Sequence, residues 1–325
     1  MIVRRAIVTV AGPAAVAVLA ACSGADPGAA PASSPVPSST SPSPTHTATP
    51  EQTPVPTPVA FDAAAAYATV EHLATRIGPR EAASPAFHEA AAYVQSRFEA
   101  LGYVVTTVPV PVPAGDSWGV PVEAGTSTNV IASAPGFDDA APHVVVGAHL
   151  DTVAVAPGAE DNASGIAVML DLARMAAAEP PRLPVRFIAF GAEEPRGRGD
   201  ALHHFGSQDY VAGLAPPARQ AVASMLALDR VGVPADAVPV ATGGTGTTAV
   251  MDALIAAAAA AGIPTHAEEN RASDHWSFEK ADIPAARMGS VPYAGYHSEG
   301  DVPSVVDPDQ LNRVGTVAWT WLSSL

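Results

Sequence analysis

The chain has 325 residues, and its 16 basic residues are outnumbered by 32 acidic ones, which gives a formal net charge of −16. Binding to nucleic acid depends on clustered Lys and Arg side chains that neutralise phosphates, so this balance argues against a nucleic-acid partner. The single cysteine, Cys22, excludes an intramolecular disulfide, so an exported domain must be stabilised by its hydrophobic core alone.

The first 21 residues have the pattern of an export signal. Arg4 and Arg5 precede an apolar run over residues 6–20, which is shorter than the roughly 20 apolar residues of a membrane span and is broken by Pro13. The run ends in Leu-Ala-Ala-Cys, which resembles the lipobox at which bacterial lipoproteins are cleaved and lipidated. The alternative is an ordinary secretory signal with an incidental cysteine. We predict a lipid anchor at Cys22, which would hold the protein on the outer face of the cell membrane.

Residues 22–59 are predicted to be a disordered linker. They are rich in Pro, Ser, Thr and Ala and contain almost no large apolar side chains, so they cannot bury enough surface to offset the chain entropy lost on folding.

Removal of Arg4 and Arg5 with the signal leaves 14 basic residues against 32 acidic ones, a formal net charge of −18. Such a charge would mildly attract substrates that carry a positive amino group.

Residues 60–325 have the composition and length of a single globular α/β domain. One helix is expected to begin at Asp62 and to stop at Gly78-Pro79, and a second to begin at Ser84-Pro85 and to end at Gly102. Strands are then predicted at 103–110, 128–133, 143–149, 185–190, 222–228 and 284–289, and helices near 162–178, 247–261, 274–281 and 308–323. Continuous apolar strands that alternate with helices predict an α/β fold with a mostly parallel, mixed central sheet covered by helices on both faces.

In such sheets ligands bind at the carboxyl ends of the strands, and imidazole and carboxylate groups follow several of these ends. The candidate metal ligands are His149, Asp161, Glu194, Asp229 and His297. Charges buried there would be costly without partners, and cations would satisfy all five groups. The five donors are too few for two separate four-ligand sites, but they suffice if one carboxylate bridges two metals and water completes each shell.

The types of donor indicate the metal and the chemistry. Nitrogen and oxygen donors without a thiolate fit zinc best, with manganese or cobalt as alternatives. Two metals about 3.5–4 Å apart can share a hydroxide and polarise a carbonyl group together. Glu193, which stands beside the candidate ligand Glu194, would then be free to act as a general base.

Each candidate residue also has a simpler explanation. Asp161 precedes a helix, where aspartate is a favoured N-cap, and we expect it to be both cap and ligand. The acidic residues that follow strands could be solvated, namely Glu193, Glu194 and Asp229. His149 could be a core histidine, and His297 could lie on the surface. Adjacent histidines rarely bind one metal, so His203 and His204 are expected to be helix or rim residues. Ser273-Asp274 is expected to cap the helix that follows.

Taken in order, the motifs resemble the dizinc aminopeptidases of the bacterial leucyl aminopeptidase type, whose scaffold is shared with glutaminyl cyclases and transferrin-receptor-like proteins. The motifs that carry the resemblance are His-Leu-Asp at 149–151, Asp-Asn-Ala-Ser-Gly at 161–165, Glu-Glu at 193–194, Leu-Asp-Arg-Val-Gly at 228–232 and Tyr-His-Ser-Glu-Gly-Asp at 296–301. Further matches are Gly78-Pro-Arg80, Leu101-Gly-Tyr103, Ser127-Thr-Asn-Val-Ile-Ala132, Gly206-Ser207 before Tyr210, and Ser273-Asp-His275. The resemblance spans nearly the whole of residues 60–325 and implies the zinc-exopeptidase fold, which is phosphorylase/hydrolase-like.

The resemblance also implies roles for the residues. It makes Asp161 the bridge between two zinc ions, with His149 and Asp229 completing one site and Glu194 and His297 the other. Glu193 matches the general base, Asp151 would orient the imidazole that precedes it, and Tyr296 matches a position that stabilises the oxyanion in some members. A cis peptide bond is implied after the bridging aspartate. Residues 195–205 depart from the family pattern, because this loop is longer and more basic than in relatives, and it is expected to border the site.

The function implied by the resemblance is that of a zinc metallo-aminopeptidase, a hydrolase that acts on peptides with a free N-terminus and that we expect to be monomeric. Two other enzymes on the same scaffold remain as alternatives. One is a glutaminyl cyclase, which holds a single zinc on this fold, and the other is a carboxypeptidase-like enzyme. A catalytically silent surface binding lipoprotein is the alternative from another class, although such relatives tend to lose metal ligands and none is missing here.

Overall fold

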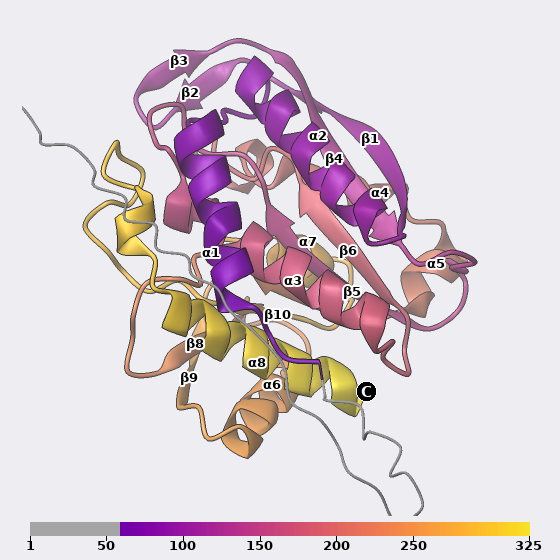
Figure 1. Ribbon diagram of the computed structural model, residues 1–325. Coiled ribbons are helices and arrows are strands. Elements are labelled where there is room, and N and C mark those ends of the chain that lie inside the picture. The colour runs from indigo at the N-terminus through magenta and orange to yellow at the C-terminus, as the bar shows by residue number, and fades with distance from the viewer. Residues whose placement is uncertain (1–58) are drawn as a thin grey trace, which may run out of the picture. The chain divides into compact units, whose positions relative to one another are not determined.

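An eight-stranded mixed β-sheet forms the centre of the computed structural model (Figure 1), which describes residues 59–325. In spatial order the strands are β1 (Val104–Val112), β4 (Gly125–Ser133), β6 (Val185–Phe190), β5 (His143–His149), β7 (Val222–Leu228), β10 (Ala285–Met288), β8 (Val238–Thr242) and β9 (Thr265–Glu269). Strands β5, β6, β7 and β10 run parallel, and β1 and β4 pair antiparallel with their neighbours. Strand β8 is antiparallel to β10 and parallel to β9. A small hairpin, β2 (Gly115–Ser117) and β3 (Val120–Val122), stands apart from this sheet.

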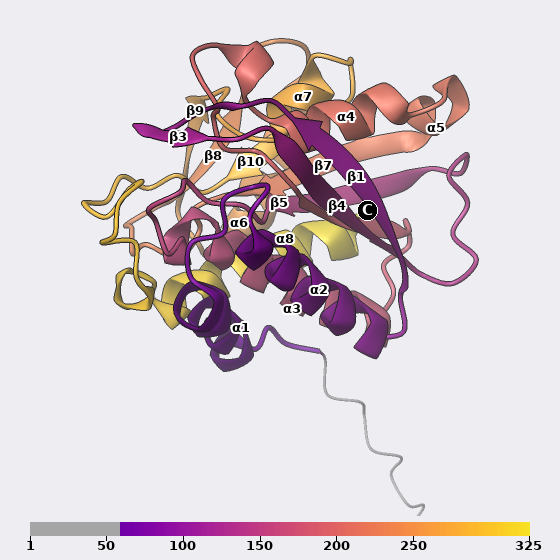
Figure 2. The ribbon, with the colours of Figure 1, turned by 90° about the horizontal axis from the view of Figure 1, so that it is seen from above.

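Helices cover both faces of the sheet (Figure 2). One face carries α1 (Ala63–Glu71), α2 (Pro85–Ala100), α3 (Gly165–Ala178), α6 (Ala249–Ala260) and α8 (Pro308–Ser324). The other face carries α4 (Phe205–Gly213), α5 (Pro216–Ala221) and α7 (His275–Glu279). Short or irregular helical turns complete the fold: η1 (His72–Ile77), η2 (Ala159–Ser164), η3 (Asp200–Leu202) and η4 (Pro303–Val305). The α/β fold with a mixed sheet covered on both faces is therefore confirmed.

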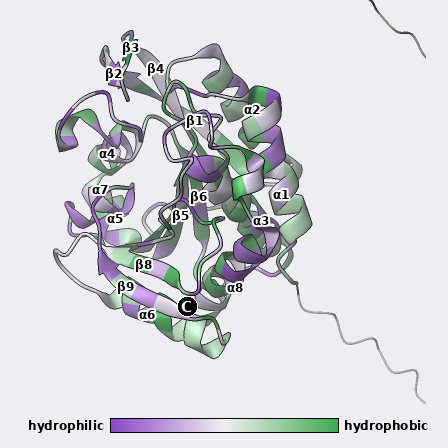
Figure 3. Cartoon of the chain, turned by 90° about the vertical axis from the view of Figure 1, so that its left-hand side faces the viewer, coloured by the Kyte–Doolittle hydropathy of each residue, from purple (hydrophilic) through white to green (hydrophobic). Residues whose placement is uncertain are grey.

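The alternation of side chains along β5 explains why the sheet needs two helical layers. Val144 and Val146 point into the larger core with α1, α2, α3, α6 and α8, whereas Val145 points into the smaller core beneath α4 and α7. Successive side chains of a strand face opposite sides of a sheet, so an entirely apolar strand must be covered on both. On the larger face α6 is drawn largely in green in Figure 3, as its alanine-rich sequence requires.

Every strand and helix predicted from the sequence is present within a few residues of its expected bounds. The strands β8 and β9, the hairpin β2–β3 and the short helices α4 and α5 were not predicted. Within residues 59–325 no helix combines the length and the apolar character that a bilayer span requires. The predictions for the signal and for Cys22 lie outside the described residues, as does nearly all of the predicted linker.

The parallel strands β5, β6, β7 and β10 end at the same edge of the sheet. The histidine that closes β5 therefore lies beside the residues that follow β6 and β7. The turn η2 and the loop between β10 and α8 reach this edge as well, because Asp301 in that loop accepts hydrogen bonds from the backbone N–H groups of Glu160 and Asp161. This edge holds the candidate site.

Candidate metal centre

The structure brings all five sequence-predicted metal ligands together, and each of them is at most 6 % exposed. They come from five different segments: the end of β5, the turn η2, the residues after β6, the residue after β7, and the loop before α8. The five residues are His149, Asp161, Glu194, Asp229 and His297.

Asp161 lies at the centre of the cluster and faces one histidine with each carboxylate oxygen. Its Oδ1 is 3.1 Å from Nε2 of His149, and its Oδ2 is 3.2 Å from Nε2 of His297. Each imidazole nitrogen also faces a second carboxylate: Oδ1 of Asp229 lies 3.6 Å from His149, and Oε2 of Glu194 lies 3.2 Å from His297. Atoms that share one tetrahedral zinc at about 2.0–2.2 Å lie roughly 3.3 Å apart, so these spacings suit two ions on opposite sides of Asp161.

The electrostatics of the cluster are those of a cation site. Burial alone would lower the pKa of His297, but the carboxylates of Glu194 and Asp161 raise it to about 10. Burial and the neighbouring Asp161 raise the pKa of Glu194 to about 7. Burial likewise acts to raise the pKa of Asp161, but hydrogen bonding to the two histidines holds it below its ordinary value. The buried carboxylates thus repel one another and gain from any positive charge placed between them.

Several donor atoms of the cluster lack a partner that the protein itself could supply. Oε1 of Glu194, Oδ1 of Asp229 and Nδ1 of His297 are buried and have no hydrogen bond within the described part of the chain. Buried polar atoms in folded proteins are nearly always satisfied, so unpartnered carboxylate oxygens in a negatively charged cluster indicate a site that binds a cation. The residues present therefore fit bound zinc.

Asp151 has a different contact from the one predicted. Its carboxylate accepts hydrogen bonds from the backbone N–H groups of Glu193 at 2.9 Å and Glu194 at 3.1 Å. The carboxylate is 3.7 Å from Nδ1 of His149, which is too far for a hydrogen bond, whereas the backbone carbonyl of Asp151 is 3.2 Å from the same nitrogen. The carbonyl therefore orients the imidazole, and the carboxylate fixes the turn that carries the two glutamates.

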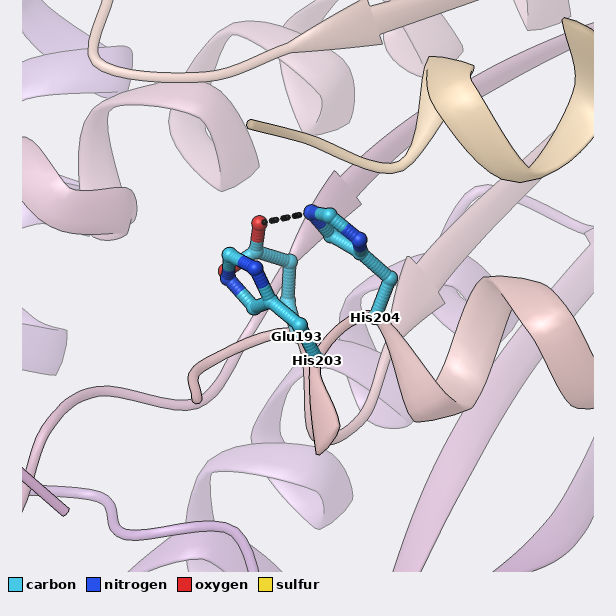
Figure 4. Close-up of side chains that lie close together, drawn as sticks. All are labelled: Glu193, His203 and His204. Carbon is cyan, nitrogen blue, oxygen red and sulfur yellow. Dashed lines mark ion pairs between the residues drawn. The ribbon is translucent and has the colours of Figure 1, made fainter. Parts of the chain in front are cut away.

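The prediction that His203 and His204 are helix or rim residues is incomplete. His204 directly precedes α4 and His203 is partly exposed, but both also face Glu193 (Figure 4). Nε2 of His204 is 3.1 Å from Oε1 of Glu193, and Nε2 of His203 is 3.5 Å from its Oε2. His204 is 1 % exposed. The loop after β6 bends back so that its end lies beside its beginning: His204 donates its backbone N–H to the carbonyl of Glu193.

Two predicted helix caps are also corrected. Asp161 does not cap α3, because the side chain of Asn162 accepts the hydrogen bond from the backbone N–H of Gly165 at 3.0 Å. The carboxylate of Asp161 is turned instead toward the histidines, and the peptide bond between Asp161 and Asn162 is cis, as the resemblance implied. The side chains of Ser273 and Asp274 make no capping bond to α7.

Three residues that support the cluster were not identified from the sequence. Arg287 of β10 is fully buried, and its Nη2 lies 3.2 Å from Oδ2 of Asp229. Asp301 holds the backbone of η2, as described above, and Arg80 donates to five backbone carbonyls, among them those of Leu150, Pro157 and Gly158. Arg80 and Asp301 stand inside the quoted motifs, and the charge within the apolar strand β10 was the signal for Arg287.

A cavity of about 80 Å³ opens on the cluster. Trp118 from the β2–β3 hairpin, Arg230 and Tyr296 line it together with the candidate ligands. The ring of Tyr296 is stacked on His297 with centroids 3.8 Å apart, and the guanidinium carbon of Arg230 lies 4.5 Å above the ring of Tyr296. The predicted oxyanion residue is therefore at the site, with 39 % of its surface exposed.

Solved structures of other proteins share this fold. The chain is similar to BSAP, a zinc aminopeptidase from Bacillus subtilis, with a TM-score of 0.72 and 20 % identity over 81 % of this chain and 95 % of that one. It is also similar to an aminopeptidase from Aneurinibacillus sp. strain AM-1 (TM-score 0.68, 22 % identity, 80 % and 93 % covered). Bacteroides thetaiotaomicron glutaminyl cyclase matches equally well (TM-score 0.72, 21 % identity, 83 % and 100 % covered).

At these identities the solved structures show the shared fold. A search of curated proteins found no match. The sequence model of peptidase family M28, however, matches residues 129–322, which contain every candidate ligand and more than half of the chain. The chain therefore belongs to peptidase family M28.

Proposed function

We propose that this peptidase is a zinc aminopeptidase, which hydrolyses the N-terminal peptide bond of peptides with a free amino terminus. The observation that carries the proposal is the position of Asp161, whose two carboxylate oxygens face two different histidines at 3.1 and 3.2 Å. A second carboxylate stands beside each histidine, so the five side chains divide into two sets that share Asp161.

In the proposed assignment each set would hold one zinc ion. His149 and Asp229 would bind one ion together with Asp161, and Glu194 and His297 would bind the other together with Asp161. Nitrogen and oxygen donors without a thiolate suit zinc, and manganese or cobalt would also fit. The proposed count is two ions per chain, because one ion would leave part of the buried carboxylate cluster without a counter-charge.

Bound zinc would supply Lewis-acid polarisation of the scissile carbonyl and would make water more acidic. Glu193 then acts as the general base. As the oxygen of a water molecule bonds to the carbonyl carbon, the carboxylate of Glu193 takes the proton that the water loses. It delivers this proton to the amide nitrogen as the carbon–nitrogen bond breaks, and the products are a free amino acid and a shortened peptide.

The surrounding residues position this base and the reacting carbonyl. The carboxylate of Asp151 binds the backbone N–H groups of both glutamates and so fixes the direction of the Glu193 side chain. Tyr296 lines the cavity beside His297, where its hydroxyl group is proposed to donate to the oxyanion that forms on the carbonyl oxygen. The net negative charge of the chain, a formal −16, mildly favours a substrate that carries an ammonium group.

Glutaminyl cyclisation is the second candidate, because a cyclase matches the fold with the same TM-score as the aminopeptidase from Bacillus subtilis. The two functions differ in substrate and in metal count. A cyclase would act on N-terminal glutamine without cleaving a peptide bond, and a content near one zinc per chain would favour it.

An assay of purified protein on amino-acid amides and peptides, with and without a chelator, tests the proposal. We expect cleavage of free peptides that stops when metal is removed, and little or no cleavage of the same peptides acetylated at the N-terminus. Equal rates on acetylated and free peptides would rule out an aminopeptidase. Cyclisation of glutaminyl peptides without hydrolysis would favour the second candidate.

A further inference from the structure

The loop between β6 and α4 places a stacked pair of histidines on the proposed general base. The rings of His203 and His204 lie with centroids 3.8 Å apart and an interplanar angle of 19°. Their Nε2 atoms both face Glu193, and each faces a different carboxylate oxygen, at 3.5 and 3.1 Å (Figure 4). None of the five proposed zinc ligands belongs to this group, which is a second arrangement of donors at the edge of the first.

The ring nitrogens of His204 make no hydrogen bond within the described residues. The residue is 1 % exposed. Its Nδ1 lies 3.7 Å from a carboxylate oxygen of Asp200, beyond hydrogen-bond distance. Buried polar atoms usually have a partner, so the ring nitrogens of His204 are available to bind an ion.

The spacing of the three groups suits one divalent metal ion. One ligand atom from each residue can be chosen so that all three lie within 4.8 Å of one another. The distances from the glutamate oxygens to the two imidazole nitrogens bracket the roughly 3.3 Å that separates two atoms on one tetrahedral zinc. Two imidazoles and one carboxylate also form a donor set that zinc uses in proteins.

An ion can reach this group from outside the zinc pair. The side chain of His203 is 24 % exposed and lines two cavities. One is the cavity of about 80 Å³ over the proposed zinc pair, and the other is a neighbouring cavity of about 510 Å³ bordered by Asp200 and Trp276.

We propose that Glu193, His203 and His204 form an additional divalent-metal site that inhibits the enzyme when it is filled. An ion bound there engages the carboxylate of Glu193, so this carboxylate can no longer accept a proton from water. The site offers one carboxylate and two imidazoles, whereas each set of the pair offers two carboxylates and one imidazole. It therefore carries less negative charge and fills at higher free zinc than the pair. The inhibitory consequence rests on the proposed function, whereas the binding of the ion does not.

The test is a zinc titration of the purified protein in which bound metal is counted after equilibrium dialysis and peptidase activity is measured in the same samples. The wild-type chain should bind one ion more at high free zinc than at the level that first gives full activity, and activity should fall as this ion binds. His203→Gln should require at least about ten times more free zinc for the same inhibition, because even the loss of a group that orients a metal ligand costs about 10- to 100-fold in affinity. Glu193→Gln, counted by metal content alone, should keep the tightly bound ions and lose the additional one.

His266→Ala is the matched control, because His266 is an exposed histidine on β9, away from the described cluster. It should bind the additional ion as the wild type does. A wild-type chain that binds no additional ion, or an additional ion that persists in both His203→Gln and Glu193→Gln, would overturn the proposal. An additional ion that depends on these residues in a protein without aminopeptidase activity would support the site and refute the proposed function instead.

Discussion

Glu193 lies farther from the proposed ligand histidines than the other carboxylates of the site do. Glu194 and Asp229 each lie within 3.6 Å of a proposed ligand histidine, whereas the nearest such nitrogen to Glu193 is 4.0 Å away, on His149. Its closer neighbours are the imidazoles of the following loop. This position leaves Glu193 beside the proposed ions without binding them, as a base requires.

Glu193→Gln should therefore lower kcat by about 10²- to 10⁴-fold, because the amide keeps the shape of the side chain but cannot accept the proton. Folding and the count of tightly bound metal should stay at the wild-type values, as measured by circular dichroism and metal analysis. Glu89→Gln on the exposed surface of α2 is the control and should have wild-type activity. Wild-type turnover in Glu193→Gln would refute the mechanism.

At the scale of residues, the candidate ligands at the strand ends are easier to predict from the sequence than the residues that hold them in place. The five candidate ligands and Glu193 were predictable because each stands at a strand end or in a loop, where a buried charge is costly without a partner. Asp301 is 141 positions from the residue whose N–H it binds, and Arg287 meets Asp229 only through the pairing of β10 with β7. Contacts of this kind follow from the arrangement of the sheet, so the sequence can mark such a residue as unusual but does not identify its partner.

At the scale of elements, the loop from β5 to η2 depends on one buried side chain from another segment. The guanidinium of Arg80 donates to carbonyl groups on both sides of this loop, at Leu150, Pro157 and Gly158. Arginine offers five donors in a rigid planar group, and lysine offers a single ammonium. The loop, and with it the turn that carries Asp161, is thus held in place by a residue that touches no proposed ligand.

Arg80→Lys should lower the free energy of unfolding by about 3 kcal/mol, because several buried carbonyl groups lose their donor. Urea denaturation followed by circular dichroism measures this change, and the affinity for the proposed metals should fall with it as the loop loosens. Arg76→Lys, at an exposed position of η1, is the control and should change the free energy by less than about 0.5 kcal/mol. An Arg80→Lys variant as stable as this control would contradict the structural role.

Burial explains only part of which strands were predictable. Strands β5, β6 and β7 are mostly apolar and buried and were predicted, but β8 is buried along its whole length and was missed. Strand β9 has the sequence Thr-His-Ala-Glu-Glu, lies at the edge of the sheet and has no fully buried residue, so neither alternation nor apolar content marks it. Helix α4 begins immediately after the unusual loop, and its N-cap residue, His204, makes no side-chain capping hydrogen bond.

At the scale of the whole molecule, the proposed protein consists of a peptidase domain, a linker and a lipid anchor. We propose that Cys22 is lipidated and that residues 22–59 link it to the domain, which would act outside the cell membrane. Each buried methylene of an acyl chain contributes about 0.8 kcal/mol, so more than one chain gives a lasting attachment. The formal charge of −16 makes an electrostatic attachment to anionic lipids unfavourable, so attachment would depend on the acyl chains.

Cys22→Ser should therefore move the full-length protein from the membrane fraction to the soluble extracytoplasmic fraction, with no incorporation of labelled fatty acid. Fractionation of cells that express the full chain, followed by immunoblotting, measures the distribution. Ser23→Ala is the control and should stay with the membrane. Labelling and membrane association that survive in Cys22→Ser would show that the anchor is elsewhere.

In the proposed metal centre Asp161 is shared by two zinc ions. A crystal structure of the zinc-loaded protein, with anomalous diffraction collected on both sides of the zinc absorption edge, tests this arrangement. We expect two zinc peaks about 3.5–4 Å apart, one bound by His149 and the other by His297, with one oxygen of Asp161 on each. A single peak at full zinc loading, or two peaks of which only one touches Asp161, would refute a shared Asp161.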